Sequence, residues 1–259
     1  MKKTLIFLAL LLWLNPLQAE TAQERGLQIA TAADQRHSGF ADVTADLKMV
    51  LRDSKGNQAE RELGSQRLEV QGDGDKVMLT FKAPADIRNT ALLSHTHSLR
   101  ADDQWLFLPS LKRVKRISSK NKSGPFVGSE FAFEDLSSQE VDKYRYKFLR
   151  NEPCGGMVCH VIERYPEYEH SGYTRQVVWV EREQLLVLRT DYYDRKNSLL
   201  KTLSVKGYQQ YLGKHWRPAE MHMHNHQTKK STTLYWSNYE FGTGLVDRDF
   251  VKDKLSRGR

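Results

Sequence analysis

The sequence predicts a mainly β protein built around a single curled antiparallel sheet of roughly ten or eleven strands. Three observations indicate this class. Apolar and polar residues alternate in many short segments, and turn-forming residues separate those segments at hairpin spacing. No segment beyond the N-terminal region is long and apolar enough to suggest a membrane-spanning helix.

The N-terminus has the composition of a secretory signal peptide. Lys2 and Lys3 precede an almost unbroken apolar run at residues 4–14, and Pro16 then breaks this run. Ala19 offers the small residue that precedes a cleavage site. A membrane anchor is the alternative, but the run is short for a bilayer. We therefore expect a cleaved leader that ends at Ala19 and a soluble periplasmic protein.

The mature chain, residues 20–259, is expected to form a single domain, because about 240 residues can bury one large core. Its formal charge falls from +8 to +6 when Lys2 and Lys3 are removed. A basic exterior suits anionic lipid headgroups or an acidic partner. An exported chain without a recognition motif is not expected to bind nucleic acid, and no cofactor motif is present.

A helix is predicted at the start of the mature chain, over about residues 21–34. Thr21 and Glu24 have the spacing of a capping box, and Leu27 and Ile29 contribute to a small apolar face. After this segment the hydrophobic period changes to two.

Each predicted strand shows this alternation and is bounded by turn residues. The first expected strand, residues 43–51, contains Met49 and is followed by a turn at residues 53–57. The other expected strands lie at residues 63–70, 77–81, 105–109, 144–148, 158–162, 176–180, 185–188, 203–205, 219–226 and 232–236. Residues 117–138 interrupt the pattern, and residues 248–255 are expected to form a short helix or tail.

The two cysteines, Cys154 and Cys159, are separated by four residues that include Gly155 and Gly156. In an oxidising compartment two nearby thiols usually pair, and the glycines allow the chain to turn tightly between them. We expect a structural disulfide. A redox role is the alternative, but the spacing differs from that of a Cys-x-x-Cys motif.

Two segments resemble a known family. Residues 105–117 read WLFLPSLKRVKRI, and residues 128–136 read GSEFAFEDL. Both resemble the LolA-like proteins of outer-membrane lipoprotein sorting, which are often associated with exporters of the RND (MMPL) type. The resemblance implies a half-barrel with a few short helices covering its concave side, and an apolar cavity for the acyl chains of lipid or lipoprotein. It also implies an inner-membrane RND/MMPL-type exporter and an outer-membrane acceptor as partners.

The apolar residues that would face inward in such a half-barrel are candidates for lining the cavity. A curled sheet of this many strands can leave such a space, although each candidate could instead fill a core. They are Leu47, Met49, Leu51, Leu79, Phe81, Trp105, Phe107, Val177 and Trp179.

The interruption at residues 117–138 is the second candidate site, as a mobile lid. Its three phenylalanines would cap the cavity, and the basic run before them would meet a headgroup or a partner. The lid and partner candidates are Arg113, Arg116, Phe126, Phe131, Phe133 and Asp135. The alternative is structural: Ser129 caps a short helix, Asp135 pairs with Arg116, and the lysines form a solvated face.

Three histidines, His222, His224 and His226, share one face of a predicted strand, with Met221 and Met223 on the other. Alternate residues on a strand are about 7 Å apart, so at most two could bind one metal ion. We therefore expect a polar, outward-facing strand surface, and a weak copper or zinc site is the alternative.

No catalytic constellation is expected. The chain contains no Gly-x-Ser-x-Gly elbow and no His-Glu-x-x-His motif. Ser94 and His95, with Ser98 near Asp102, are weak evidence for a triad, because adjacency in sequence does not predict one. The expected function is therefore a non-enzymatic carrier or binder of lipid or lipidated cargo. The alternatives are a periplasmic module that senses lipid or lipoprotein, and a lipid hydrolase.

Overall fold

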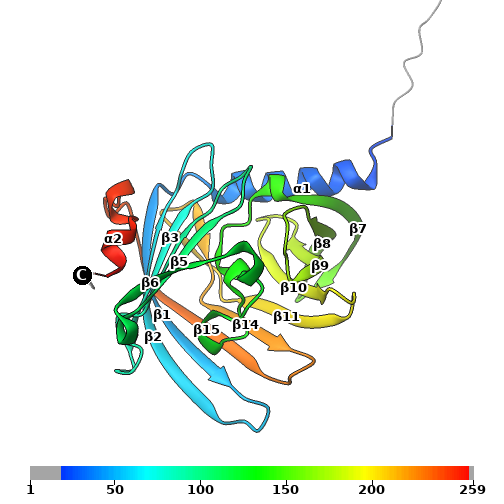
Figure 1. The fold of residues 1–259 in the computed structure, drawn as a ribbon. Coiled ribbons are helices and arrows are strands. Elements are labelled where there is room, and N and C mark those ends of the chain that lie inside the picture. Colours follow the sequence, from blue (N-terminus) through cyan, green and yellow to red (C-terminus); the bar gives the residue numbers. More distant parts are fainter. Residues whose placement is uncertain (1–18, 257–259) are drawn as a thin grey trace, which may run out of the picture.

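The computed structural model describes residues 19–256 (Figure 1), so the predicted leader lies outside the described residues except for Ala19. Thirteen strands form one antiparallel sheet in the order β6-β5-β4-β3-β2-β1-β15-β14-β11-β10-β9-β8-β7. The sheet curls and does not close, because β6 and β7 remain its two edges. The predicted class is confirmed, with more strands than expected. No helix within residues 19–256 is long and apolar enough to cross a membrane.

The strands alternate with short turns along most of the chain. The strands of the large sheet are β1 (Asp42–Arg52), β2 (Gln58–Leu68), β3 (Lys76–Ala83), β4 (Ala91–His95), β5 (Asp103–Leu108), β6 (Arg113–Ile117), β7 (Tyr144–Cys154), β8 (Met157–Pro166), β9 (Tyr173–Glu181), β10 (Val187–Asp194), β11 (Leu199–Lys206), β14 (Glu220–Asn225) and β15 (Ser231–Phe241). A separate hairpin consists of β12 (Gln209–Tyr211) and β13 (His215–Arg217).

Between Ala19 and Ser256, helical structure is limited to two α-helices and several single turns. They are α1 (Ala22–His37), α2 (Lys252–Leu255), η1 (Pro109–Leu111), η2 (Ser119–Asn121), η3 (Phe126–Gly128), η4 (Phe133–Leu136), η5 (Val141–Lys143) and η6 (Asp247–Asp249).

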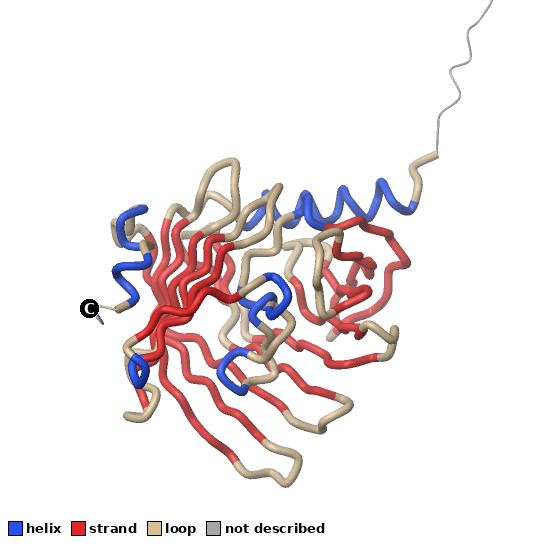
Figure 2. The backbone as a smooth tube through the Cα atoms, viewed as in Figure 1, coloured by secondary structure: helices blue, strands red, loops and turns tan. Residues whose placement is uncertain are grey.

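The two edge strands, β6 and β7, follow one another in the chain, although they lie at opposite ends of the sheet. Residues 118–143, called the inner segment below, must therefore cross from one edge to the other. Figure 2 shows their short helical turns inside the curve of the strands. The crossing follows from the strand order, and it places this segment on the concave face.

Strand pairing determines which residues share the concave face. Leu47 of β1 pairs with Leu63 of β2 and with Trp236 of β15, and Leu63 pairs with Phe81 of β3. Paired residues point to the same side of a sheet, so these apolar side chains form one continuous inner surface. The outer surface carries the intervening residues, such as Lys48.

Helix α1 begins where the sequence predicts. Thr21 accepts a hydrogen bond from the Glu24 backbone N–H, and the Glu24 side chain accepts one from the Thr21 N–H, which completes the capping box. Gly26 allows close packing, because a Cβ there would lie 2.8 Å from the backbone nitrogens of Lys147 and Phe148 in β7. The helix therefore rests directly on an edge strand and extends along one side of the half-barrel (Figure 1).

The C-terminal segment covers the outer face of the sheet. Phe250 and Leu255 are buried against Leu93 and Phe107. Figure 1 shows α2 on the outer side of the strands, away from the inner segment. This agrees with the short helix expected near the C-terminus and gives the helix a packing role.

The cysteine pair closes the hairpin between β7 and β8. Cys154 and Cys159 form a disulfide with a Cα–Cα distance of 5.9 Å. Gly155 and Gly156 both have positive φ values, which the tight turn between the strands requires. The predicted disulfide is confirmed.

Candidate functional site

A cavity of about 740 Å³, called the hollow below, lies between α1 and the concave face of the sheet. Strands β8 and β9 contribute its floor, and the inner segment and the loop that holds β12 and β13 contribute its sides. Its volume lies within the range of small-molecule sites. Its apolar and aromatic lining consists of Ala30, Ala33, Phe40, Val70, Val141, Tyr146, Ile162, Val178, Val180, Leu185, Leu186, Val187, Tyr208, Trp216, Pro218 and Met221.

The floor of the hollow follows from strand alternation. Val178 and Val180 of β9 point inward, and Ile162 of β8 lies opposite Val178 in the register. Facing them are Ala30 and Ala33, three residues apart on α1 and therefore on the same side of the helix. The two small side chains leave space between helix and sheet that larger ones would fill.

Charged side chains of both signs also line the hollow. The Arg67 guanidinium lies 3.8 Å from the Asp75 carboxylate. Burial, together with the nearby carboxylates of Asp75 and Asp34, raises the pKa of Glu140 to about 7. Burial and the charge of Arg67 lower the pKa of Arg217 to about 10. The hollow is therefore amphiphilic, with an apolar floor and a charged margin.

The other half of the concave face is filled. Phe126, Phe131 and Phe133 of the inner segment are all buried in the main apolar cluster of the sheet. The rings of Phe81 and Phe126 stack with centroids 5.7 Å apart. These phenylalanines therefore form a core with side chains of β1–β6, β9–β11, β14 and β15. The hollow lies beside this core, against β8–β10.

Buried polar contacts hold the inner segment in place. Lys201 of β11 donates to the Asp135 carboxylate at 2.6 Å and to the Glu130 carbonyl at 2.9 Å. The Tyr173 hydroxyl donates to the other oxygen of Asp135 at 2.8 Å. These contacts favour a fixed inner segment over the mobile lid expected from the sequence.

The structure also corrects the expected partners in this region. Asp135 pairs with Lys201, whereas Arg116 donates to Asp103. Ser129 is not the N-cap of a helix. It lies at the C-cap of η3, where its backbone N–H donates to the carbonyl of Phe126, and its hydroxyl donates to the carbonyl of Phe131. The pairing of Asp135 with Arg116 and the N-cap role of Ser129, which belonged to the structural alternative, are both wrong.

The basic run before the inner segment lies at the edge of the sheet. Arg113 and Arg116 are exposed on β6, and Lys112 is exposed in the turn that precedes it. None of the three lines the hollow. Their proposed contact with a headgroup or partner would therefore occur outside the hollow.

None of the nine predicted cavity residues lines the hollow. Five of them do lie in or against the main apolar cluster on the inner face, packed with the inner segment. These five are Leu47, Met49, Leu51, Leu79 and Phe81.

The other four predicted cavity residues have the opposite orientation. Trp105 and Phe107 lie in the outer-face cluster that the C-terminal segment covers. Val177 and Trp179 alternate with the inward-facing Val178 and so point outward. Their predicted inward orientation is wrong, because both faces of β5 and of β9 carry apolar side chains and the alternation has two possible phases.

The histidines of β14 face outward and hydrogen-bond to neighbouring strands. His222 bonds to Thr233 through Nδ1, and His226 bonds to Thr202 through Nε2. The inward-facing residue Met223 is fully buried, as the alternation predicts. Within residues 19–256, no group of three or more histidine, cysteine or acidic residues is arranged to hold a metal ion.

The residues considered for a hydrolytic triad do not assemble. Ser94 faces inward and accepts a hydrogen bond from Gln104. His95, its neighbour in the strand, faces the other side and bonds to the carbonyl of Phe250. The Asp102 carboxylate accepts hydrogen bonds from the ammonium groups of Lys122 and Lys143. Ser94 and His95 thus point to opposite faces of the sheet and cannot act together.

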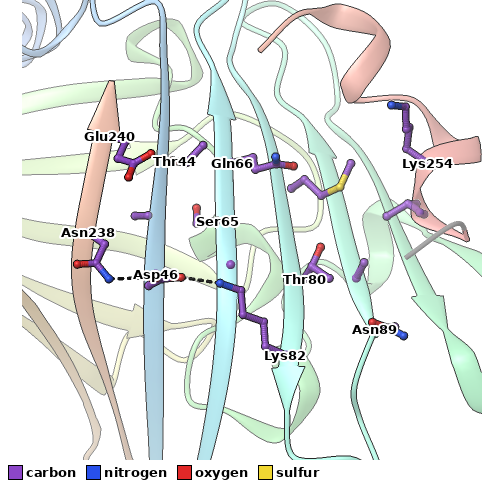
Figure 3. Close-up of a pocket in the computed structure, with 15 residues that line it drawn as sticks. Thr44, Asp46, Ser65, Gln66, Thr80, Lys82, Asn89, Asn238, Glu240 and Lys254 are labelled. Atoms are coloured by element: carbon purple, nitrogen blue, oxygen red, sulfur yellow. Dashed lines mark hydrogen bonds and ion pairs between the residues drawn. The ribbon is translucent and has the colours of Figure 1, made fainter. Parts of the chain in front are cut away.

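A smaller pocket of about 400 Å³ lies on the outer face between β1–β3, β15 and α2 (Figure 3). The main charged side chains of this pocket already pair with each other. Asp46 accepts hydrogen bonds from Lys82 at 2.6 Å and from Asn238 at 2.8 Å. This pocket lacks the apolar floor of the hollow, so the hollow is the stronger candidate for a binding site.

Comparison with solved structures identifies the fold family. A domain from Vibrio parahaemolyticus, named for outer membrane lipoprotein sorting, has 49% sequence identity and a TM-score of 0.89, and the match covers 91% of this chain and 100% of that one. The chain belongs to the family of this outer membrane lipoprotein-sorting domain. A family model described as an uncharacterized protein matches residues 73–257. No curated protein matches the sequence.

Two further structures have the same fold, which is LolA-like. A DUF1329 family protein from Desulfovibrio piger has 28% identity and a TM-score of 0.86. A LolA superfamily protein from Nitrosomonas europaea has 21% identity and a TM-score of 0.71, which supports the fold alone. Each match covers 91% of this chain and 100% of the other chain.

Several residues of this LolA-like hollow were missed by the sequence analysis. Val178 and Val180 lie on a predicted strand, and the sequence pattern favours neither phase of its alternation. Asp75 and Glu140 lie in loops, and Arg217 ends the short strand β13. Only the fold brings these three charged residues together, and no local pattern in the sequence indicates that they lie close to one another.

Proposed function

We propose that this LolA-like protein is a periplasmic binder and carrier of lipid or lipidated cargo, and that the cargo's hydrocarbon occupies the hollow. The observation that carries the proposal is the cavity of about 740 Å³ with an apolar floor. Each methylene buried from water contributes about 0.8 kcal/mol, but transfer from a bilayer to such a cavity is close to neutral. A carrier needs this balance, because it must both take up its cargo and release it.

The proposed location rests on the N-terminal sequence. The basic and apolar residues that end at Ala19 have the composition of a secretory leader. The inner-membrane RND/MMPL-type exporter and outer-membrane acceptor implied by the family resemblance belong to the same proposal. N-terminal sequencing of protein from the periplasmic fraction should find a start close to Glu20.

The cargo proposal is tested by filling the hollow. Ala33 lines the hollow, whereas its neighbour Ala32 is exposed and does not. Protein purified from the periplasm should carry lipid that native mass spectrometry detects. We expect Ala33→Trp to lose most of this lipid, because the indole would occupy the space of the hydrocarbon. Ala32→Trp, the matched control on the same helix, should retain it.

The result that would overturn the proposal is equally specific. If both tryptophan variants fold and carry the same lipid as the wild type, the hollow is not the binding site. If the wild type carries no lipid and binds none when it is added, the carrier function fails altogether.

A further inference from the structure

The hollow contains charged groups that the chain itself leaves without partners. Within residues 19–256, no hydrogen bond or ion pair engages the carboxylates of Asp34 and Glu140, both of which line the hollow. Asp75, beside them, forms a long ion pair of 3.8 Å with Arg67 and also interacts with Ser138 and the backbone of Val70. Glu140 and Asp75 are partly buried, whereas Asp34 is exposed at the rim of the hollow. Leaving a partly buried charge unpaired is unfavourable, so these carboxylates are available to pair with a cationic ligand.

Arg217, a positive group in the hollow, also lacks an oppositely charged partner within the described residues. The Arg217 guanidinium donates one hydrogen bond, to the carbonyl of the adjacent Trp216, and has no carboxylate partner in the described part of the chain. It lies over the rings of Phe40 and Phe241, at 4.8 and 5.4 Å from their centroids. This stacking orients the guanidinium and leaves most of its donors free.

The two sets of charges are adjacent. Asp34 and Asp75 both raise the pKa of Glu140, and Arg67 lowers the pKa of Arg217, so each set is close enough to interact internally. The contact between Arg67 and Asp75 joins the two sets. A ligand with a single negative charge would satisfy the arginines and be repelled by the carboxylates beside them.

We propose that the hollow recognises a zwitterionic amphiphile whose headgroup joins an ammonium to a phosphate, as in phosphatidylethanolamine. The carboxylates of Glu140, Asp75 and Asp34 receive the ammonium, and Arg217 with Arg67 receives the phosphate. This inference rests on the proposed function, because the acyl chains of such a lipid would occupy the apolar floor.

One further donor fits this assignment. The indole Nε1–H of Trp216 is buried and has no hydrogen-bond partner within residues 19–256, and Trp216 lines the hollow beside Arg217. A buried donor without an acceptor is costly. A phosphate or ester oxygen of the lipid would supply the acceptor.

The test uses short-chain, water-soluble lipids and the mature full chain after removal of co-purified lipid. Dihexanoyl-phosphatidylethanolamine, dihexanoyl-phosphatidylglycerol and free phosphoethanolamine are titrated separately by calorimetry. We expect the phosphatidylethanolamine to bind about tenfold more tightly than the phosphatidylglycerol, the difference that charge-assisted hydrogen bonds to the ammonium would supply. Free phosphoethanolamine should bind more weakly than the lipid that carries it.

The variants separate the two ends of the headgroup. Glu140→Gln should remove about tenfold of the affinity for phosphatidylethanolamine. Phosphatidylglycerol, which this carboxylate no longer repels, should bind the variant at least as tightly as the wild type, and this also shows that the variant is folded. Arg217→Gln should weaken the binding of both lipids. Glu60→Gln is the control, because Glu60 is exposed and pairs with Lys48 on the outer face. It should change neither affinity.

The possible failures are distinguishable. If both lipids bind equally, or if Glu140→Gln leaves the preference intact, the zwitterion assignment is wrong and lipid binding stands. If free phosphoethanolamine binds as tightly as the lipid, the ligand is a polar headgroup and not an amphiphile. If neither lipid binds, the proposed carrier function is also wrong.

Discussion

At the residue scale, the buried ion pair between Lys201 and Asp135 holds the inner segment against β11. Both side chains are only 4% exposed. The Lys201 ammonium also lies 5.2 and 5.3 Å from the ring centroids of Tyr173 and Tyr192. A buried charge depends on such partners, because removing one partner leaves the other charge uncompensated.

This pair should be far more important for stability than a surface pair. We expect Lys201→Met to lower the free energy of unfolding by about 3–5 kcal/mol, because Asp135 would remain buried without its cation. Lys48→Met is the matched control, since Lys48 and Glu60 form a pair that is half exposed on the outer face. It should cost less than about 1 kcal/mol. Urea denaturation measures the free energy of unfolding of both variants. Similar decreases in the two would contradict a stabilising role for the pair of Lys201 and Asp135.

The residue scale is also where the sequence analysis made its errors. Val177 and Val178 are both buried, but they point to opposite faces of β9. Trp105 and Leu106 show the same ambiguity in β5, where the C-terminal segment buries the outer face. Hydrophobicity shows that such a strand is covered, but it does not show which side faces the cavity.

At the scale of the elements, the inner segment is explained by strand order. Its ends follow and precede the two edge strands, so it has to link them, and its phenylalanines hold it on the concave face. The sequence indicated an unusual connection through its glycines, phenylalanines and acidic residues. Its role as core for β1–β5 depends on contacts with strands distant in sequence, such as Phe126 on Phe81.

The β7–β8 hairpin offers a test at the same scale. Replacing both Cys154 and Cys159 with serine should lower the free energy of unfolding by about 2 kcal/mol, because a short loop is no longer closed in the unfolded chain. Neither cysteine lines the hollow, so the lipid content should stay the same. Denaturation and native mass spectrometry measure the two effects. A loss of lipid would contradict a purely structural role for the bond.

At the scale of the whole molecule, the half-barrel is divided between a filled half and a hollow half. The inner segment packs against β1–β6 and also contacts side chains of β9–β11, β14 and β15. The hollow lies between α1 and β8–β10. Side chains that border a cavity lose packing contacts on that side. The hollow half should therefore be the less stable of the two when no cargo is bound.

Hydrogen exchange should reveal this division. Without lipid, the backbone amides of β8 and β9 should exchange faster than those of β1–β3, because their inner face borders the hollow. Lipid that occupies the hollow should slow exchange in β8, β9 and α1, and the amides of β1–β3 serve as the internal control. Equal protection of both halves, with and without lipid, would contradict the proposed division of the sheet.

Local patterns account for the part of this protein that sequence reasoning predicted correctly. Period-two alternation and turn residues led to the antiparallel sheet, the spacing of Thr21 and Glu24 to the start of α1, and the nearby cysteines to the disulfide. Each depends on residues close together in the chain. The hollow does not, because Asp34, Glu140 and Arg217 meet only after the sheet curls and its edge strands are joined across the concave face. Tertiary structure alone decided which faces became core, which remained open and which charges line the opening.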